Sequence, residues 1–446
     1  MFDAVVRGGT LVTHGLPRAD VAIEDGKIVA IGPDLAGAEE EIDARGLHVF
    51  PGLIDVHLHF NEPGRTDWEG AATGSRALAA GGGTLFFDMP LNSTPCTVNA
   101  DAFDRKHAAL AEASVTDFAL WGGLIPGNVS EMAELADRGV VGFKAFLCDS
   151  GLPEFPRADD LTLFEGLREA ARLGLPVAVH AESQEITQGL GRRTVPGERS
   201  SVRAFLASRP VLAELEAIQR ATFLAGEAGA KLHIVHVSSG RGVALAAEAR
   251  AQGVDVSIET CPHYLFFTED DVERLGAIAK CAPPLRNGGE QDSLWSQLLK
   301  GGVDIVASDH SPAPPDMKSG DFAQAWGGIA GVQSTLSVML DRGHHHRQLS
   351  LERISSLIAA EPARRFRIPT KGSVALGMDA DFALVDVSRS TQLEPGQLKQ
   401  RYALSPYLGC TFRGCIERTI RRGKTIFMSG DIIARGGGNF VRPARG

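Results

Sequence analysis

The stretch Gly52-Leu53-Ile54-Asp55-Val56-His57-Leu58-His59-Phe60 joins a short apolar run to two histidines at its carboxyl end. Seven similar runs follow it, separated by stretches rich in Ala, Leu and Glu that are typical of helices. The eight runs are 52–60, 84–90, 117–122, 140–147, 176–182, 231–238, 255–260 and 303–310. Strands alternating with helices predict parallel βαβ units, and eight such units over about 250 residues predict a (β/α)8 barrel of the α/β class. A doubly wound sheet is the alternative, but no Gly-x-Gly-x-x-Gly follows an early run.

The two ends of the chain have a different pattern, in which short β-like runs alternate with turns. Asp25-Gly26 near the start is a strong hairpin signal. Arg422-Gly423-Lys424 and Ser429-Gly430-Asp431 are turns near the end. We therefore expect residues 51–368 to form the barrel, and residues 1–50 and 369–446 to form one small β-sandwich domain built from both termini.

Composition excludes several classes of function. The 446 residues carry 45 Lys and Arg against 55 Asp and Glu, a net charge of −10, so no basic face for nucleic acid is expected. No apolar stretch approaches the roughly 18 residues of a membrane span, and the start lacks a signal peptide pattern. Six scattered cysteines without a Cys-x-x-Cys pair are typical of reduced thiols. We expect a cytoplasmic protein without nucleic-acid or membrane partners.

Ionisable side chains recur at the carboxyl ends of five of the eight runs. In a (β/α)8 barrel these ends meet at one mouth, where buried charges are costly unless they are paired or bound to a metal. His57 and His59 have the same strand parity, so both imidazoles can bind one metal ion. His236 is nearer the end of its run than His233 and is the better candidate. The candidate set is His57, His59, Lys144, His180, His236 and Asp309.

Each of these residues also has a simpler interpretation. A lone His-x-His is a weak signal, and a single buried histidine is more often a satisfied core residue. Lys144 could extend its ammonium to the surface, and Asp309 could be a turn residue. The recurrence at five strand ends favours the joint metal site over these separate explanations.

Eight segments of the sequence resemble the cyclic amidohydrolase family of dihydroorotases, hydantoinases and allantoinases. They include Pro51–His59, Asn61-Glu62-Pro63-Gly64-Arg65-Thr66-Asp67-Trp68-Glu69-Gly70 and Lys280-Cys281-Ala282-Pro283-Pro284-Leu285-Arg286. The others are 88–92, 142–146, 259–265, 308–312 and 325–331. The resemblance covers nearly the whole chain, and within the family it is greatest to the allantoinases.

The resemblance implies a dinuclear metal centre and a homotetramer. His57, His59, Lys144 and Asp309 would hold the buried ion, and Lys144, His180 and His236 the outer ion. Lys144 would be a carbamate, whose two oxygens can bridge the ions and whose charge four neutral imidazoles lack. Zn²⁺ suits these donors best, and Co²⁺, Mn²⁺ and Fe²⁺ remain open.

Two departures from the family pattern restrict the substrate. Asn61 stands where dihydroorotases carry an Arg for the substrate carboxylate, and residues 146–151 lack the Tyr of hydantoinases. The resemblance therefore implies opening of the neutral ring of allantoin to allantoate, with Asp309 as general base and acid. A hydantoinase or dihydropyrimidinase acting on another neutral cyclic amide is the alternative. The expected contacts to this small-molecule substrate are Asn92, Ser150, Trp326 and Gly327. A non-catalytic relative would be expected to lose ligands, and none is missing here.

Overall fold

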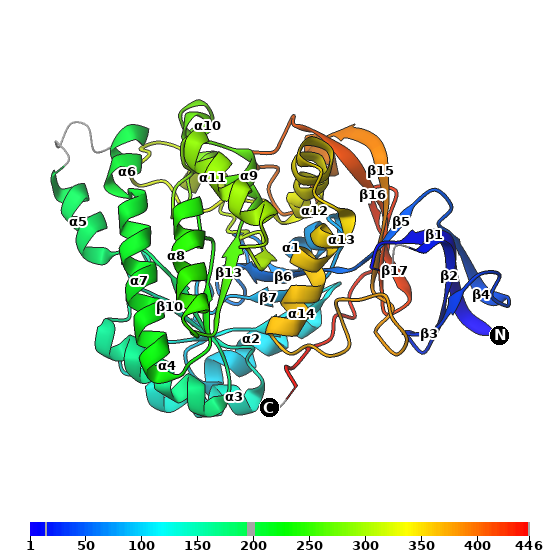
Figure 1. Ribbon diagram of the computed structural model, residues 1–446, viewed down its shortest axis with the longest axis horizontal. Coiled ribbons are helices and arrows are strands. Elements are labelled where there is room, and N and C mark those ends of the chain that lie inside the picture. Colours follow the sequence, from blue (N-terminus) through cyan, green and yellow to red (C-terminus); the bar gives the residue numbers. More distant parts are fainter. Residues whose placement is uncertain (14–15, 194–200, 445–446) are drawn as a thin grey trace.

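Parallel strands enclose the centre of the larger part of the molecule (Figure 1). The computed structural model describes residues 1–13, 16–193 and 201–444. The strands are β6 (Leu53–Leu58), β7 (Gly83–Asp88), β8 (Asp117–Leu120) with β9 (Gly122–Gly123), β10 (Phe143–Phe146), β11 (Val177–His180), β12 (Leu232–Ile234), β13 (Val256–Thr260) and β14 (Ile305–Val306). Each lies within one of the eight apolar runs, except at the ends of β7 and β9.

The strands close into a ring. Pairing runs β6-β7-β8 and β9-β10-β11-β12-β13-β14, and only Trp121 separates β8 from β9. The ring closes where the amide of His59 donates to the carbonyl of His310 at 2.8 Å. The predicted (β/α)8 barrel is confirmed.

Helices cover the outside of the barrel, as Figure 1 shows for α4, α7 and α8. The helices between strands include α1 (Ala71–Ala80), α2 (Ala100–Ala113), α3 (Met132–Arg138), α4 (Asp160–Leu173), α7 (Val211–Ala228), α8 (Gly240–Ala251) and α11 (Gly288–Leu299). Local sequence sets their limits: in α4 the carboxylate of Asp159 accepts from the amide of Thr162, and Gly174 ends the helix at φ 70°.

Alternation along the strands divides the core into two clusters. In β7, Phe86 packs in the cluster shared with the helices, whereas Leu85 and Phe87 belong to a second cluster within the barrel. Phe366 belongs to the second cluster and packs edge-on against Phe87. Strands such as β7 and β11 are buried along their whole length, as expected where helices cover the outer face.

Both ends of the chain contribute to one sheet beside the barrel (Figure 1). Its order is β18-β17-β16-β15-β5-β1-β2-β3, with β4 paired to β1. The strands are β1 (Phe2–Leu11), β2 (Leu16–Glu24), β3 (Lys27–Gly32), β4 (Ala38–Asp43), β5 (His48–Pro51), β15 (Phe382–Gln392), β16 (Thr411–Arg421), β17 (Lys424–Met428) and β18 (Asp431–Ile432). The two termini are joined where β5 pairs antiparallel with β15.

Two details of this sheet bear on the sequence interpretation. The predicted hairpin at Asp25-Gly26 is confirmed, because both residues have positive φ and connect β2 to β3. Strand β4 is missing from the predicted strands, because Ala-Glu-Glu-Glu-Ile-Asp shows no regular apolar alternation.

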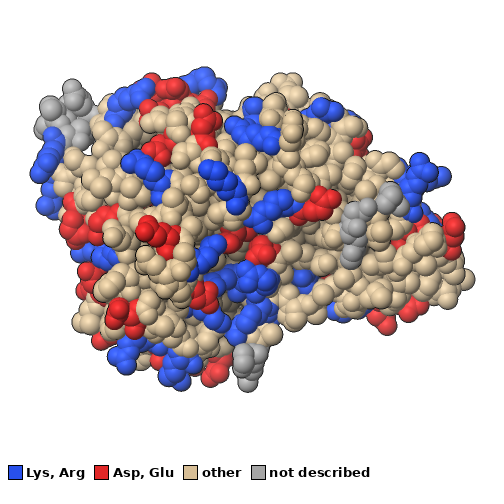
Figure 2. Space-filling view, viewed as in Figure 1, with Lys and Arg blue, Asp and Glu red and all other residues tan. Residues whose placement is uncertain are grey.

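A buried ionic cluster connects this sheet to the barrel. The ammonium of Lys371 lies 2.8 Å from the carboxylate of Asp117, at the start of β8, and 3.1 Å from that of Asp379. Asp381 is its third carboxylate partner. On the face seen in Figure 2, acidic and basic side chains are interspersed. Within the described ranges, no helix combines the length and apolarity needed to cross a membrane.

Candidate metal centre

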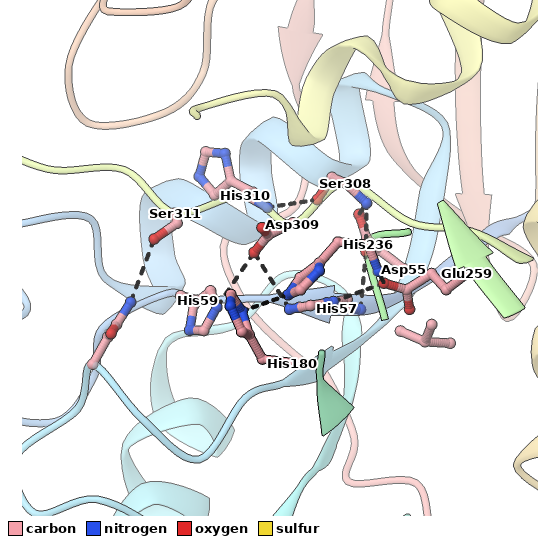
Figure 3. A network of polar contacts seen from close by, with 12 residues as sticks. Asp55, His57, His59, His180, His236, Glu259, Ser308, Asp309, His310 and Ser311 are labelled. Carbon is pink, nitrogen blue, oxygen red and sulfur yellow. Dashed lines mark hydrogen bonds and ion pairs between the residues drawn. The ribbon is translucent and has the colours of Figure 1, made fainter. Parts of the chain in front are cut away.

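His57, His59 and Asp309 meet at the carboxyl end of the barrel (Figure 3). Oδ1 of Asp309 lies 3.3 Å from Nε2 of His57 and 3.5 Å from Nε2 of His59. The strand parity of the His-x-His pair thus brings both imidazoles to one carboxylate oxygen. Asp309 has φ 44°, a left-handed backbone that is unusual for a residue other than glycine.

His180 and His236 form the other side of the same cluster. Nδ1 of His180 lies 3.0 Å from Nε2 of His236, and the rings of His236 and His57 are 5.4 Å apart. Ligand atoms of His57, His236 and Asp309 all lie within 4.8 Å of one another, a spacing that can hold a metal ion. His233 is bonded instead to Ser257 and Glu259, which agrees with the choice of His236.

Lys144, on β10, is fully buried among the same groups. Among the residues that the structure describes, its Nζ has no hydrogen-bond partner. It lies 5.1 Å from the centre of the Phe146 ring. Burial lowers the pKa of Lys144 to about 8, which makes the neutral amine accessible near physiological pH.

The protonation states suit a divalent cation. Burial lowers the pKa of His57, His180 and His236, so each imidazole is held in the neutral form that binds metals. Burial by itself would raise the pKa of Asp309, but the imidazoles of His57 and His59 outweigh it and lower that pKa below its usual range. The cluster therefore offers three imidazoles held in the neutral form and one anionic carboxylate.

Glu259, at the end of β13, is a site residue to which the sequence analysis assigned no role. Its Oε1 accepts from Nδ1 of His57 at 2.7 Å and from the amide of His236 at 3.1 Å. Its Oε2 lies 3.0 Å from Nε2 of His233. A proton on Nδ1 leaves Nε2 of His57 free toward Asp309, so Glu259 orients the ring and selects its tautomer. The sequence signal that could have identified Glu259 is its position in a buried strand, on the side that faces the centre of the barrel.

Glu182 has the same relation to His180. Its Oε2 lies 2.9 Å from Nε2 of His180 and also pairs with the guanidinium of Arg209. Burial would raise the pKa of Glu182, but Arg209 and His180 lower it to about 2. Cys148 lies beside this pair, and burial raises the pKa of its thiol to about 12. That thiol is unsuited to act as a nucleophile.

Two of the expected substrate contacts converge on Ser311, two residues after Asp309. The amide of Asn92 donates to Oγ of Ser311 at 3.4 Å, and Nε1 of Trp326 donates to its carbonyl at 3.2 Å. Ser311 lies in the segment 308–312, and no role was predicted for it from the sequence. The ring of Trp326 also meets that of Trp68 at 4.9 Å.

The other two expected contacts differ. The hydroxyl of Ser150 donates to the carbonyl of Phe155 at 2.6 Å, so it is engaged within its own loop. A side chain at Gly327 would meet nothing within 4 Å, which leaves this backbone accessible. Asp149, next to Ser150, is exposed.

Comparison with known proteins agrees with this geometry. The profile of the Amidohydrolase family matches residues 48–426, and the chain belongs to that family. Over 99% of this chain and 97% of the relative, it is 67% identical to an allantoinase of Solibacter usitatus. An allantoinase of Rubrobacter xylanophilus is 58% identical over 100% of this chain and 98% of its own. The resemblance inferred from the motifs is confirmed.

Solved structures give the same fold. An L-hydantoinase (dihydropyrimidinase) from Arthrobacter aurescens matches with a TM-score of 0.96 and 36% identity, over 99% of this chain and 100% of that one. A D-hydantoinase matches with a TM-score of 0.92 and 31% identity, over the full length of both chains.

Proposed function

We propose that this protein hydrolyses the ring amide of allantoin to give allantoate. The full-length identity to allantoinases carries the proposal, and an intact ligand set at the barrel mouth supports it. Asn61 is buried, and its amide donates to the carbonyl of Pro312 at 3.3 Å. A neutral amide at this place suits an uncharged ring rather than a carboxylate.

The donors fit a pair of divalent cations. His57, His59 and Asp309 would hold one ion, His180 and His236 the other, and Lys144 both. A buried atom supports this fit, because Nζ of Lys144 lacks a partner within the described residues. Addition of the neutral Lys144 amine to carbon dioxide, with loss of one proton, would give the bridging carbamate. Zn²⁺ suits these donors, as do Co²⁺, Mn²⁺ and Fe²⁺.

When bound, such a pair supplies an activated water near neutral pH and polarises the scissile carbonyl. Asp309 accepts the proton of the attacking water and returns it to the leaving ring nitrogen. Its lowered pKa keeps the carboxylate unprotonated before each turnover. Asn92, Trp326 and the backbone at Gly327 would orient the ring.

A hydantoinase or dihydropyrimidinase activity is the second candidate. The agreement in fold with the Arthrobacter aurescens enzyme favours it, at 36% identity. Identity to allantoinases is higher, at 67% and 58%, and places allantoin first.

A parallel assay tests the function. Turnover of allantoin, hydantoin and dihydroorotate is measured on one preparation whose metal content is quantified. We expect allantoin to have the highest kcat/KM, with about two metal ions per chain. Faster turnover of hydantoin by the metal-loaded protein would assign it to the second candidate.

We also propose that residues 1–50 and 369–446 form a β-sandwich domain beside a barrel at 51–368. Residues of both segments, including Val6, Val21, Phe382 and Ile420, share one apolar cluster, which supports this division. We further propose a cytoplasmic homotetramer. The six cysteines are all unpaired, which suits a reducing compartment, and light scattering after gel filtration tests the subunit number.

A further inference from the structure

The segment 322–328, which carries Trp326 and Gly327, contacts one buried lysine, Lys280, and one half-buried lysine, Lys318. The ammonium of Lys280 donates to the carbonyls of Phe322 at 2.7 Å, Ala323 at 3.1 Å and Ala325 at 2.7 Å. The rings of Phe205 and Phe322 each lie 5.0 Å from it. All three N–H donors of this ammonium thus have a backbone acceptor.

Lys318 makes similar contacts at the following residues of the segment. Its ammonium donates to the carbonyls of Trp326 at 2.9 Å, of Ala277 at 3.0 Å and of Gly328. Together the two lysines bind five carbonyls between residues 322 and 328. Outside a regular sheet or helix these carbonyls need donors from elsewhere, and a compact cationic head with three N–H groups meets that need.

The clamped segment packs directly against the catalytic side of the barrel. The carbonyl of Ser311 accepts from the Trp326 ring, and a Cβ placed on Gly328 would lie 2.3 Å from that carbonyl. Ser311 follows Asp309 by two residues. A displacement of the segment would therefore move Trp326 and Gly327 relative to the reacting centre.

We propose that Lys280 and Lys318 are positioning residues, whose ammonium groups hold segment 322–328 in the conformation that binds substrate. Methionine in either place would fill the same space without a donor. The segment would lose three hydrogen bonds in the Lys280 variant and two in the Lys318 variant. This inference rests on the proposed function for the identity of the substrate, but not for the clamp itself. Lys280, the first residue of the motif Lys280–Arg286, would then serve to hold this segment in place.

The first test compares Lys280→Met and Lys318→Met with Lys300→Met, an exposed lysine at the end of α11, in the metal-loaded enzyme. We expect amide hydrogen exchange in residues 322–328 to be at least about tenfold faster in both clamp variants, and unchanged in the control. KM for allantoin should rise about tenfold or more, with kcat changed much less, because uniform binding is lost. Unchanged exchange in both clamp variants would overturn the proposal, as would a loss confined to kcat.

Chemical rescue provides a second, independent test. Lys318→Ala removes the ammonium group and three methylene groups, so the carbonyls of Ala277, Trp326 and Gly328 face a space that a small cation can enter. Ammonium chloride should restore exchange protection and KM, whereas tetramethylammonium chloride at equal ionic strength, which has no N–H donor, should not. Equal effects of the two salts would overturn the proposal. If one lysine variant fails to fold, the other carries the test, since both act on the same segment.

The exchange measurement needs no substrate. Absence of allantoin turnover in the parent enzyme, with faster exchange in the variants, would refute the proposed function and leave the clamp supported. Normal turnover in the parent enzyme, with unchanged exchange in the variants, would support the proposed function and refute the clamp.

Discussion

Replacement of Glu259 by Gln isolates the contribution of one buried carboxylate to the metal centre. Gln has nearly the same shape and keeps one oxygen that can accept from Nδ1 of His57, which now lies 2.7 Å from Oε1. The variant loses the negative charge shared by His57, His233 and the amide of His236. A hydrogen bond to a charged group contributes about 1.5–3 kcal/mol and a neutral one about 0.5–1.5 kcal/mol, so the bond to His57 should lose about 1–1.5 kcal/mol.

That loss corresponds to about tenfold in binding, and the weaker bond to the His236 amide adds to it. We therefore expect Glu259→Gln to weaken one cation by about 10–100-fold, in line with the range for residues that orient metal ligands. Competition with a chelator, followed by metal analysis of the protein, measures this affinity. The melting temperature of the loaded variant shows whether the fold is retained.

Glu182→Gln is the matched comparison, because Glu182 orients His180 in the way that Glu259 orients His57. If each carboxylate orients only its own histidine, each variant should weaken the binding of a different cation. In each variant, the cation that is not affected should bind more tightly than the weakened one. A folded Glu259→Gln variant with parent affinity for both ions would refute the reasoning.

Four further predictions concern the site and the fold. Asp309→Asn should lower kcat by about 10²–10⁴-fold with the fold intact, because the proton acceptor is lost. Lys144→Ala should lose metal and activity, and a short carboxylate should partly restore both. Lys371→Met should reduce the free energy of unfolding in urea by about 3–5 kcal/mol, because it leaves buried carboxylates uncompensated. The stability that Glu182 contributes should be present above pH 4.5 and lost as the pH falls toward about 2, so acid unfolding of Arg209→Gln should show less of this loss.

Each of these has an opposite outcome that is equally clear. Parent turnover by metal-loaded Asp309→Asn would exclude its role in proton transfer. Full metal occupancy in Lys144→Ala would contradict a bridging carbamate. Lys27, which pairs with Asp379 but is partly exposed, provides the control for Lys371: equal losses from both methionine variants would mean that burial is not the cause. Identical acid unfolding profiles with and without Arg209 would show that this guanidinium does not lower the pKa of Glu182.

The barrel could be predicted from the sequence because it follows from strand periodicity. The same periodicity predicted that His57, His59, His180, His236 and Asp309 would converge at its mouth. In a run such as Val303–His310, both the apolar residues and Asp309 near the carboxyl end can be read directly from the sequence. Parallel strands then bring such ends together. The choice of His236 over His233 rested on position alone, and the contacts of His233 with Ser257 and Glu259 agree with it.

The remaining site residues depend on contacts between distant segments, which periodicity does not encode. Glu259 matters because it meets His57, 202 positions away. Its inward position on a buried strand is a local signal, but that signal does not reveal which residue it contacts. Ser150 was expected at the substrate as a neutral hydrogen-bond partner, but its hydroxyl donates to the carbonyl of Phe155 within the loop. The lysine clamps were equally hidden, because their acceptors are backbone carbonyls, which every sequence has.

The pairing of β5 with β15 has a consequence for biosynthesis. The entire barrel separates these strands in the chain, so β5 leaves the ribosome with one row of amides and carbonyls that has no neighbour until β15 emerges. A bare strand edge can recruit another nascent chain. The sheet beside the barrel is thus the last part of the molecule to be completed. Truncated products that stop short of β15 would be prone to aggregate through the free edge of β5.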